Sequence, residues 1–130
     1  RNPLDNILSI YRAHFAQGSR YSSSILDTAK MYLEEKRIMN KYSKEFPNKI
    51  FKLNYESVVK DSESTIRKLI YWLGWEWDEK YLSPELNMRS ISTASSVQVR
   101  SAINTKSIDS WRNYSDLIRP AIQIIANNTK

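Results

Sequence analysis

Arg1 and Ser9 are a pair of side chains that could bind a phosphate together. Arg1 precedes Asn2 and Pro3, which suit the N-cap and first position of a helix, where N–H groups and the dipole favour anions. Ser9 follows eight residues later, about 12 Å along a helix. An arginine reaching forward and a serine hydroxyl can share one phosphate. Judged on spacing alone, a surface arginine and an ordinary helix serine are the more frequent outcome.

Other candidates for a binding site lie later in the chain. Tyr55 ends a predicted strand, at the edge where open α/β sheets bind ligands, although core packing is the more common role of a single tyrosine. Arg100 and Lys106 are candidate cations, while most arginines and lysines only solvate a surface. His14 is the only histidine and falls beside an apolar helical face, which favours a structural role over a catalytic one.

The spacing of apolar residues predicts that helices position most of these side chains. Capping residues, glycines and prolines indicate where each helix begins and ends. A polar stretch over residues 87–107 is expected to be a long ordered loop. The predicted helices run from Asn2 to Gly18, from residues 22–24 to about Glu45, from Asp61 or Ser62 to Gly74, before Pro84, over 108–114 and over 115–127.

A single stretch, Lys49–Glu56, has the alternating pattern of a strand. A strand must pair its backbone groups, yet no second convincing strand is visible. Three explanations are open: unrecognised partner strands, a dimer formed through this strand, or a sheet that lies upstream of Arg1. The third is preferred, and it predicts an α/β fold in which this chain is mostly α-helical with one strand at about 49–56.

Composition excludes several classes of site. The chain has 130 residues, two glycines, one histidine and no cysteine. A glycine-rich phosphate loop, a disulfide framework and a cysteine or histidine metal cluster are therefore ruled out. No stretch is long and apolar enough for a membrane span, and the first residues lack signal-peptide character, which is compatible with the cytoplasm. The net charge of +6 favours an anionic partner.

Three blocks of sequence together resemble a known family. Residues 1–12 (RNPLDNILSIYR) are similar to the 3′-phosphate motif of sulfotransferases that use 3′-phosphoadenosine-5′-phosphosulfate (PAPS). Residues 54–56 (NYE) resemble the strand-end Tyr-Glu of that family. Residues 93–100 (TASSVQVR) and 107–114 (SIDSWRNY) are similar to the C-terminal region of bacterial tetratricopeptide-associated and tyrosylprotein-type sulfotransferases. The blocks follow one another in the family's order.

The resemblance implies a reaction and a set of contacts. The complete protein would transfer a sulfuryl group from PAPS to a hydroxyl or amine acceptor that the sequence does not identify, with no metal. In the family, the arginine and serine of the first motif grip the 3′-phosphate, the tyrosine contacts the adenine, and the serine also influences when the sulfuryl group is released. The expected nucleotide contacts are Arg1, Ser9, Tyr55, Ser95, Ser96, Arg100 and Lys106, with Arg100 preferred over Lys106 as the further phosphate cation.

The resemblance also implies what this chain lacks. The family's phosphosulfate loop and its catalytic base both precede the arginine–serine motif, so residues 1–130 are expected to be the C-terminal portion of one domain with a P-loop-like sulfotransferase fold. No catalytic residue is expected here, and the isolated chain is expected to be inactive. The alternative is a non-catalytic basic helical module that binds nucleic acid or an acidic protein. Interleaved acidic residues argue against that alternative. A second alternative is an inactive relic that retains nucleotide binding or only packing.

Overall fold

A computed structural model describes residues 1–13, 15, 19–89 and 100–128. The chain divides into two compact units. Unit 1 comprises Arg1–Ile50 and Ser107–Lys130, and unit 2 comprises Phe51–Lys106. Unit 1 therefore joins the first part of the chain to its last part, which brings residues 1–12 and 107–114 of the resemblance into one unit.

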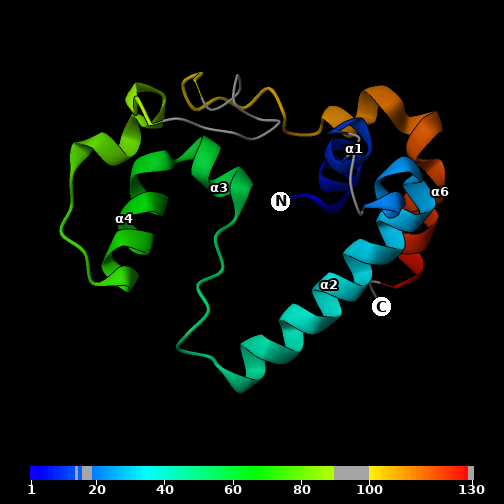
Figure 1. Cartoon of the computed structure of the whole chain (residues 1–130), viewed down its shortest axis with the longest axis horizontal. Helices are drawn as coiled ribbons and strands as arrows, with labels where there is room; N and C mark the ends of the chain where they lie inside the picture. Colours follow the sequence, from blue (N-terminus) through cyan, green and yellow to red (C-terminus); the bar gives the residue numbers. More distant parts are fainter. Residues whose placement is uncertain (14, 16–18, 90–99, 129–130) are drawn as a thin grey trace. The chain divides into compact units, whose positions relative to one another are not determined.

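Unit 1 is built on three helices that pack against one another, α1 (Pro3–Ala13), α2 (Ile25–Glu45) and α6 (Ser115–Asn127) (Figure 1). The short 3-10 helix η1 (Arg20–Ser23) precedes α2, and η4 (Ser110–Tyr114) precedes α6. Each long helix contributes apolar side chains to one shared core, because each carries them on one face. The buried members of this core are Ile7, Leu8, Ile25, Ala29, Ile118 and Ala121.

Local capping fixes where α1 and α2 begin. The Oδ1 atom of Asn2 accepts a hydrogen bond from the N–H of Leu4 at 2.9 Å, and Pro3 takes the first helical position, as predicted. Ser24 caps α2 by accepting from the N–H of Asp27 at 3.2 Å. The predicted end of α2 at about Glu45 is confirmed. Helix α1 ends at Ala13, and Gly18, where its end was predicted, lies outside the described residues.

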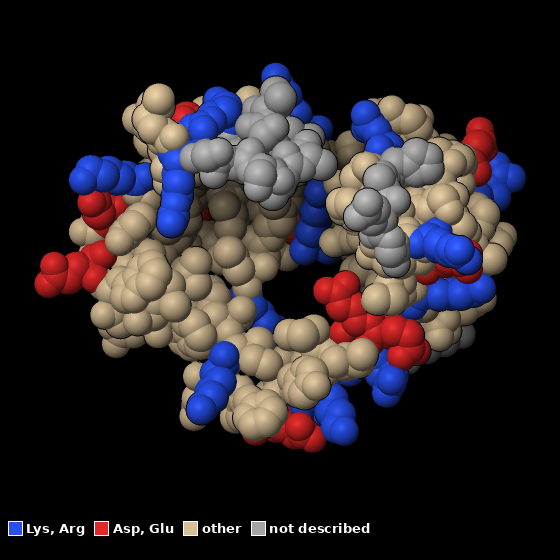
Figure 2. Space-filling model, in the orientation of Figure 1, with Lys and Arg blue, Asp and Glu red and all other residues tan. Residues whose placement is uncertain are grey.

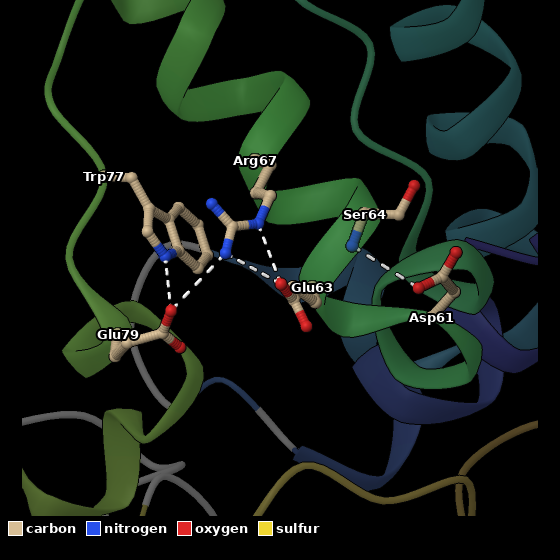
Figure 3. A network of polar contacts seen from close by, with 6 residues as sticks. All are labelled: Asp61, Glu63, Ser64, Arg67, Trp77 and Glu79. Carbon is tan, nitrogen blue, oxygen red and sulfur yellow. Dashed lines mark hydrogen bonds and ion pairs between the residues drawn. The ribbon is translucent and has the colours of Figure 1, made fainter.

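Unit 2 contains α3 (Tyr55–Lys60), α4 (Ser62–Leu73) and the 3-10 helices η2 (Glu79–Leu82) and η3 (Pro84–Leu86). Polar contacts centred on Arg67 of α4 connect this helix to Glu79, the first residue of η2 (Figure 3). The Arg67 guanidinium carbon lies 3.9 Å from the centre of the Trp77 ring. Its Nη2 lies 3.4 Å from the Glu79 oxygen that also accepts from Trp77 Nε1 at 2.8 Å. These groups are largely exposed, so the network orients residues 77–79 more than it stabilises the unit.

Gly74 ends α4 in the left-handed conformation, with φ at 69°, as the sequence predicted. Its N–H donates to the carbonyl of Tyr71 at 3.0 Å, and the N–H of Trp75 donates to the carbonyl of Ile70 at 3.1 Å. This pair of bonds is a Schellman motif, which satisfies carbonyls that the end of a helix would otherwise leave unpaired.

Gly74→Ala is expected to lower the free energy of unfolding by about 1 kcal/mol. A Cβ atom at this position would meet nothing within 4 Å, so the cost comes from the backbone conformation alone. Urea unfolding followed by circular dichroism measures the change. Gly74→Asn is the matched control and should lose less, because asparagine tolerates the left-handed region. An alanine variant as stable as the wild type would contradict this account.

The predicted α/β fold is wrong for this chain, because no strand is present among the residues that the structure describes. Residues 50–54 of the predicted strand have no regular structure, and α3 begins at Tyr55. The side chain of Asn54 explains the change, since its Oδ1 accepts from the N–H of Ser57 at 2.9 Å and from its hydroxyl at 3.2 Å. An alternating pattern needs a neighbouring strand, whereas a cap acts locally. A dimer formed through this segment consequently has no support.

Candidate functional site

Arg1 is half-buried at the entrance to α1, within unit 1. Its Nη2 atom donates a long hydrogen bond of 3.4 Å to the carbonyl oxygen of Ser107. Ser107 is the first residue of the returning segment of unit 1. The guanidinium of Arg1 is thereby directed towards the segment that leads into η4.

Ser9 lies on α1, two turns from its start, and its side chain is exposed. Its chain neighbours Ile7 and Leu8 are buried in the core, with exposed fractions of 0% and 2%. The helix therefore faces its apolar side inwards and presents Ser9 outwards. Arg1 and Ser9 belong to the same unit, with Arg1 two residues before the start of α1 and Ser9 within that helix.

The N-terminus of α1 differs from expectation in one respect. The sequence suggested that free N–H groups at this helix start would help to bind an anion. Asn2 Oδ1 instead accepts from the N–H of Leu4 at 2.9 Å and from that of Asp5 at 3.5 Å. Those donors are occupied by the cap, so anion binding here depends on the Arg1 side chain and the helix dipole.

Asp5 is a residue whose importance sequence reasoning missed. It lies in the first turn of α1 and is 1% exposed. One carboxylate oxygen accepts from the N–H of Asp109 at 2.7 Å. The other accepts from the hydroxyl of Ser110 at 3.0 Å and from the N–H of Trp111 at 2.9 Å. This buried carboxylate connects the start of α1 to the start of η4, and it acts as a cap supplied from a distant part of the chain.

The turn that Asp5 holds has an unusual backbone. Asp109 has φ at 56°, in the left-handed region that residues other than glycine seldom adopt. Its side chain lies 3.8 Å from the Nε of Arg112, whose guanidinium carbon lies 4.9 Å from the centre of the Trp111 ring. Aspartate is among the residues that tolerate this conformation best. The three bonds to Asp5 supply the free energy that keeps the turn in it.

The other predicted contacts lie in unit 2 or outside the described residues. Tyr55 is half-buried as the first residue of α3, not at a strand end. Both terminal nitrogens of Arg100 donate to backbone carbonyls, one to Asn87 and the other to Arg89 at 2.9 Å. The side chain of Lys106 is exposed. The structure does not describe Ser95, Ser96 or His14.

Unit 2 contains a cavity of about 670 Å³. The carbonyl of Asn87, which accepts from Arg100, belongs to a residue of the cavity wall. The wall is formed by Lys80, Tyr81, Ser83, Pro84, Leu86 and Asn87. Among the described residues of the wall, two neutral hydroxyls and one ammonium group make a mixed polar and apolar surface, and these residues do not form a cluster of cations.

Charged side chains do not form one basic stripe on the face shown in Figure 2, where basic and acidic groups are interspersed. Several cations on α2 are paired along the helix, such as Lys30 with Asp27 at 3.3 Å and Arg37 with Glu34 at 3.0 Å. Within the described part of the chain, no helix has the length and apolar character that crossing a membrane requires. The same residues contain no group of three or more acidic, histidine or cysteine side chains suited to a metal ion.

A family model covers the first two of the three sequence blocks. The model of the sulfotransferase family matches residues 1–79, which include Arg1, Ser9 and Tyr55. An uncharacterized protein of Aquifex aeolicus (strain VF5) is 30% identical over 133 residues. That alignment covers all of this chain and 18% of the relative's length, and no solved structure matches significantly. Since the family model covers more than half of the sequence, the chain belongs to the sulfotransferase family.

Proposed function

We propose that this chain binds the 3′-phosphate of PAPS for sulfuryl transfer to a hydroxyl or amine acceptor, leaving 3′-phosphoadenosine-5′-phosphate. The family match supports sulfuryl transfer in general terms. The observation that carries the finer proposal is the arrangement of the first motif. One rigid helix presents Ser9 to solvent, and a hydrogen bond to Ser107 orients the Arg1 guanidinium at the start of that helix.

The chemistry of these groups suits a phosphate monoester. Such a group carries about two negative charges near neutral pH and offers three acceptor oxygens. Arg1 would supply charge and two or more parallel N–H donors, while Ser9 would supply a neutral hydroxyl. The positive end of the α1 dipole adds to the attraction. The pair would thus distinguish a nucleotide that has a 3′-phosphate from one that lacks it.

The remaining predicted residues belong to the proposal in lesser roles. Tyr55 would contact the adenine, and Ser95 and Ser96 would offer hydroxyls to the nucleotide. Arg100, or else Lys106, would be the further cation that neutralises the negative charge of the 3′-phosphate. For Arg100 this role requires exchanging its carbonyl partners for phosphate oxygens. As in phosphoryl transfer, the protein's contribution would be positioning and charge stabilisation, and Ser9 would additionally influence release of the sulfuryl group.

Calorimetric titration of 3′-phosphoadenosine-5′-phosphate against adenosine-5′-phosphate tests the proposal. Preferential binding of the 3′-phosphorylated nucleotide, retained at raised salt, is the expected result. Equal binding of any polyanion that weakens steeply with salt would favour a basic binding module instead. Absence of binding to either nucleotide would contradict the proposed function of this chain.

Ser9→Ala is expected to weaken binding of the 3′-phosphorylated nucleotide by about 1–3 kcal/mol, the range for a lost hydrogen bond to a charged group. Adenosine-5′-phosphate should bind as before, since it lacks the 3′-phosphate that Ser9 would contact. Ser115→Ala is the matched control, because Ser115 is an exposed serine at the start of α6 in the same unit. An unchanged affinity in Ser9→Ala would remove Ser9 from the site.

A further inference from the structure

We propose that Asp5 is a positioning residue for the nucleotide, acting on Arg1 through the turn that carries Ser107. The inference rests on the proposed function, since Arg1 must meet the 3′-phosphate for its orientation to matter. It assigns a binding role to a buried carboxylate that the phosphate itself would not contact.

The contacts of Asp5 fix one end of the returning segment to α1. Three donors from three consecutive residues converge on its carboxylate, at 2.7–3.0 Å. The side chain is 1% exposed, so water does not compete for these bonds. The turn at Asp109 and the start of η4 are consequently held at a defined position relative to the first turn of α1.

The same segment holds Arg1. Ser107 lies two residues before Asp109, and its carbonyl accepts from Arg1 Nη2 at 3.4 Å. A carbonyl so close to the fixed turn has little freedom to move independently. The guanidinium direction therefore depends on the Asp5 bonds, although Asp5 and Arg1 need not touch. This is the kind of support that a precisely placed binding group requires.

The direction in which nucleotide affinity changes when Asp5 loses its charge distinguishes positioning of Arg1 from direct electrostatic repulsion. A carboxylate near a phosphate repels it, so removing the charge should by itself strengthen binding of the 3′-phosphorylated nucleotide. Loss of positioning has the opposite sign, because a disordered Arg1 must be reordered on binding. A weaker affinity in a variant that has lost a negative charge is thus a specific signature of positioning.

The test measures both nucleotides on the 130-residue chain carrying Asp5→Asn, which keeps the shape and one acceptor oxygen but replaces the other with a donor. We expect affinity for 3′-phosphoadenosine-5′-phosphate to fall about tenfold, the size of one weakened charged hydrogen bond. Affinity for adenosine-5′-phosphate should not change. Asp116→Asn is the matched control, because Asp116 is an exposed acid in the first turn of α6 and the charge change is identical. It should leave both affinities unchanged.

Ser110→Ala keeps the inference testable if Asp5→Asn folds poorly, and a double variant adds a second test where Asp5→Asn folds. Ser110→Ala removes only one of the three donors, and we expect a smaller loss in the same direction, about threefold. In the Arg1→Ala background, Asp5→Asn should cause no additional loss, since both changes act through one group.

Each outcome separates this inference from the proposed function. A wild-type chain that prefers the 3′-phosphorylated nucleotide, with Asp5→Asn and Ser110→Ala keeping the whole preference, overturns the positioning role and leaves the proposed function standing. Equal losses for both nucleotides, or full additivity with Arg1→Ala, also overturn it, because they indicate a general structural effect. A wild-type chain with no preference overturns the proposed function and this inference together.

Discussion

Asp5→Ala is expected to lower the free energy of unfolding by about 3 kcal/mol or more. The substitution removes a buried carboxylate and leaves the donors of Asp109, Ser110 and Trp111 without their partner. The left-handed backbone of Asp109 then loses the contacts that offset its cost. Urea unfolding followed by far-ultraviolet circular dichroism measures the difference.

The matched control for stability is Asp116→Ala. Asp116 also lies in the first turn of a helix in unit 1, but its side chain is 89% exposed. Its ion pair with Arg119 is on the surface, so the change should stay within about 0.5 kcal/mol of the wild type. If the two variants lost equal stability, the capping role of Asp5 across the chain would be wrong.

Arg1→Ala should produce the largest change in ligand binding. It removes the charged partner of the 3′-phosphate, and we expect a loss of about 2–3 kcal/mol, roughly 30- to 150-fold in affinity. Binding of adenosine-5′-phosphate should be nearly unaffected, so discrimination between the nucleotides should disappear. Competitive titration of both nucleotides on the same preparation measures this ratio.

A second arginine provides the control for charge. Arg119→Ala removes the same charge from unit 1, at an exposed position on α6 where Arg119 pairs with Asp116. Its effect should be small and equal for the two nucleotides, because screening weakens distant surface charges. A similar loss of nucleotide affinity in both variants would show that net charge drives binding, and that Arg1 makes no specific contact with the 3′-phosphate.

Signals that act within a few residues made the helix boundaries predictable. Asn2, Asp61 and Gly74 each lie at the helix end that the sequence assigned to them, because capping depends on side chains and backbone groups in one turn. The same locality explains the end of α2 before Pro47.

The strand prediction failed because a strand needs more than alternating apolar and polar residues. It also needs a neighbouring strand with which its backbone groups can pair. Residues 49–56 have the pattern, but among the described residues they have no neighbouring strand to pair with. The cap at Asn54 offers the following residues an alternative with local hydrogen bonds. Tyr55 accordingly begins a helix, and its proposed contact with adenine has to be made from there.

The role of Asp5 could not be read from the sequence, which showed only an acidic residue suited to a first helical turn. Its partners are 104 to 106 residues away, and no periodicity relates positions so distant. Family membership was predictable from motifs and is confirmed over residues 1–79. The assignment of residues 1–130 to one C-terminal domain portion stays a prediction, as does the inactivity of the isolated chain.

A crystal structure of the chain with 3′-phosphoadenosine-5′-phosphate would show whether Arg1 and Ser9 hold the 3′-phosphate. We expect oxygens of the 3′-phosphate about 3 Å from both the Arg1 guanidinium and the Ser9 hydroxyl, while Asp5 retains its three donors in unit 1. A nucleotide bound with its 3′-phosphate remote from both groups would contradict it.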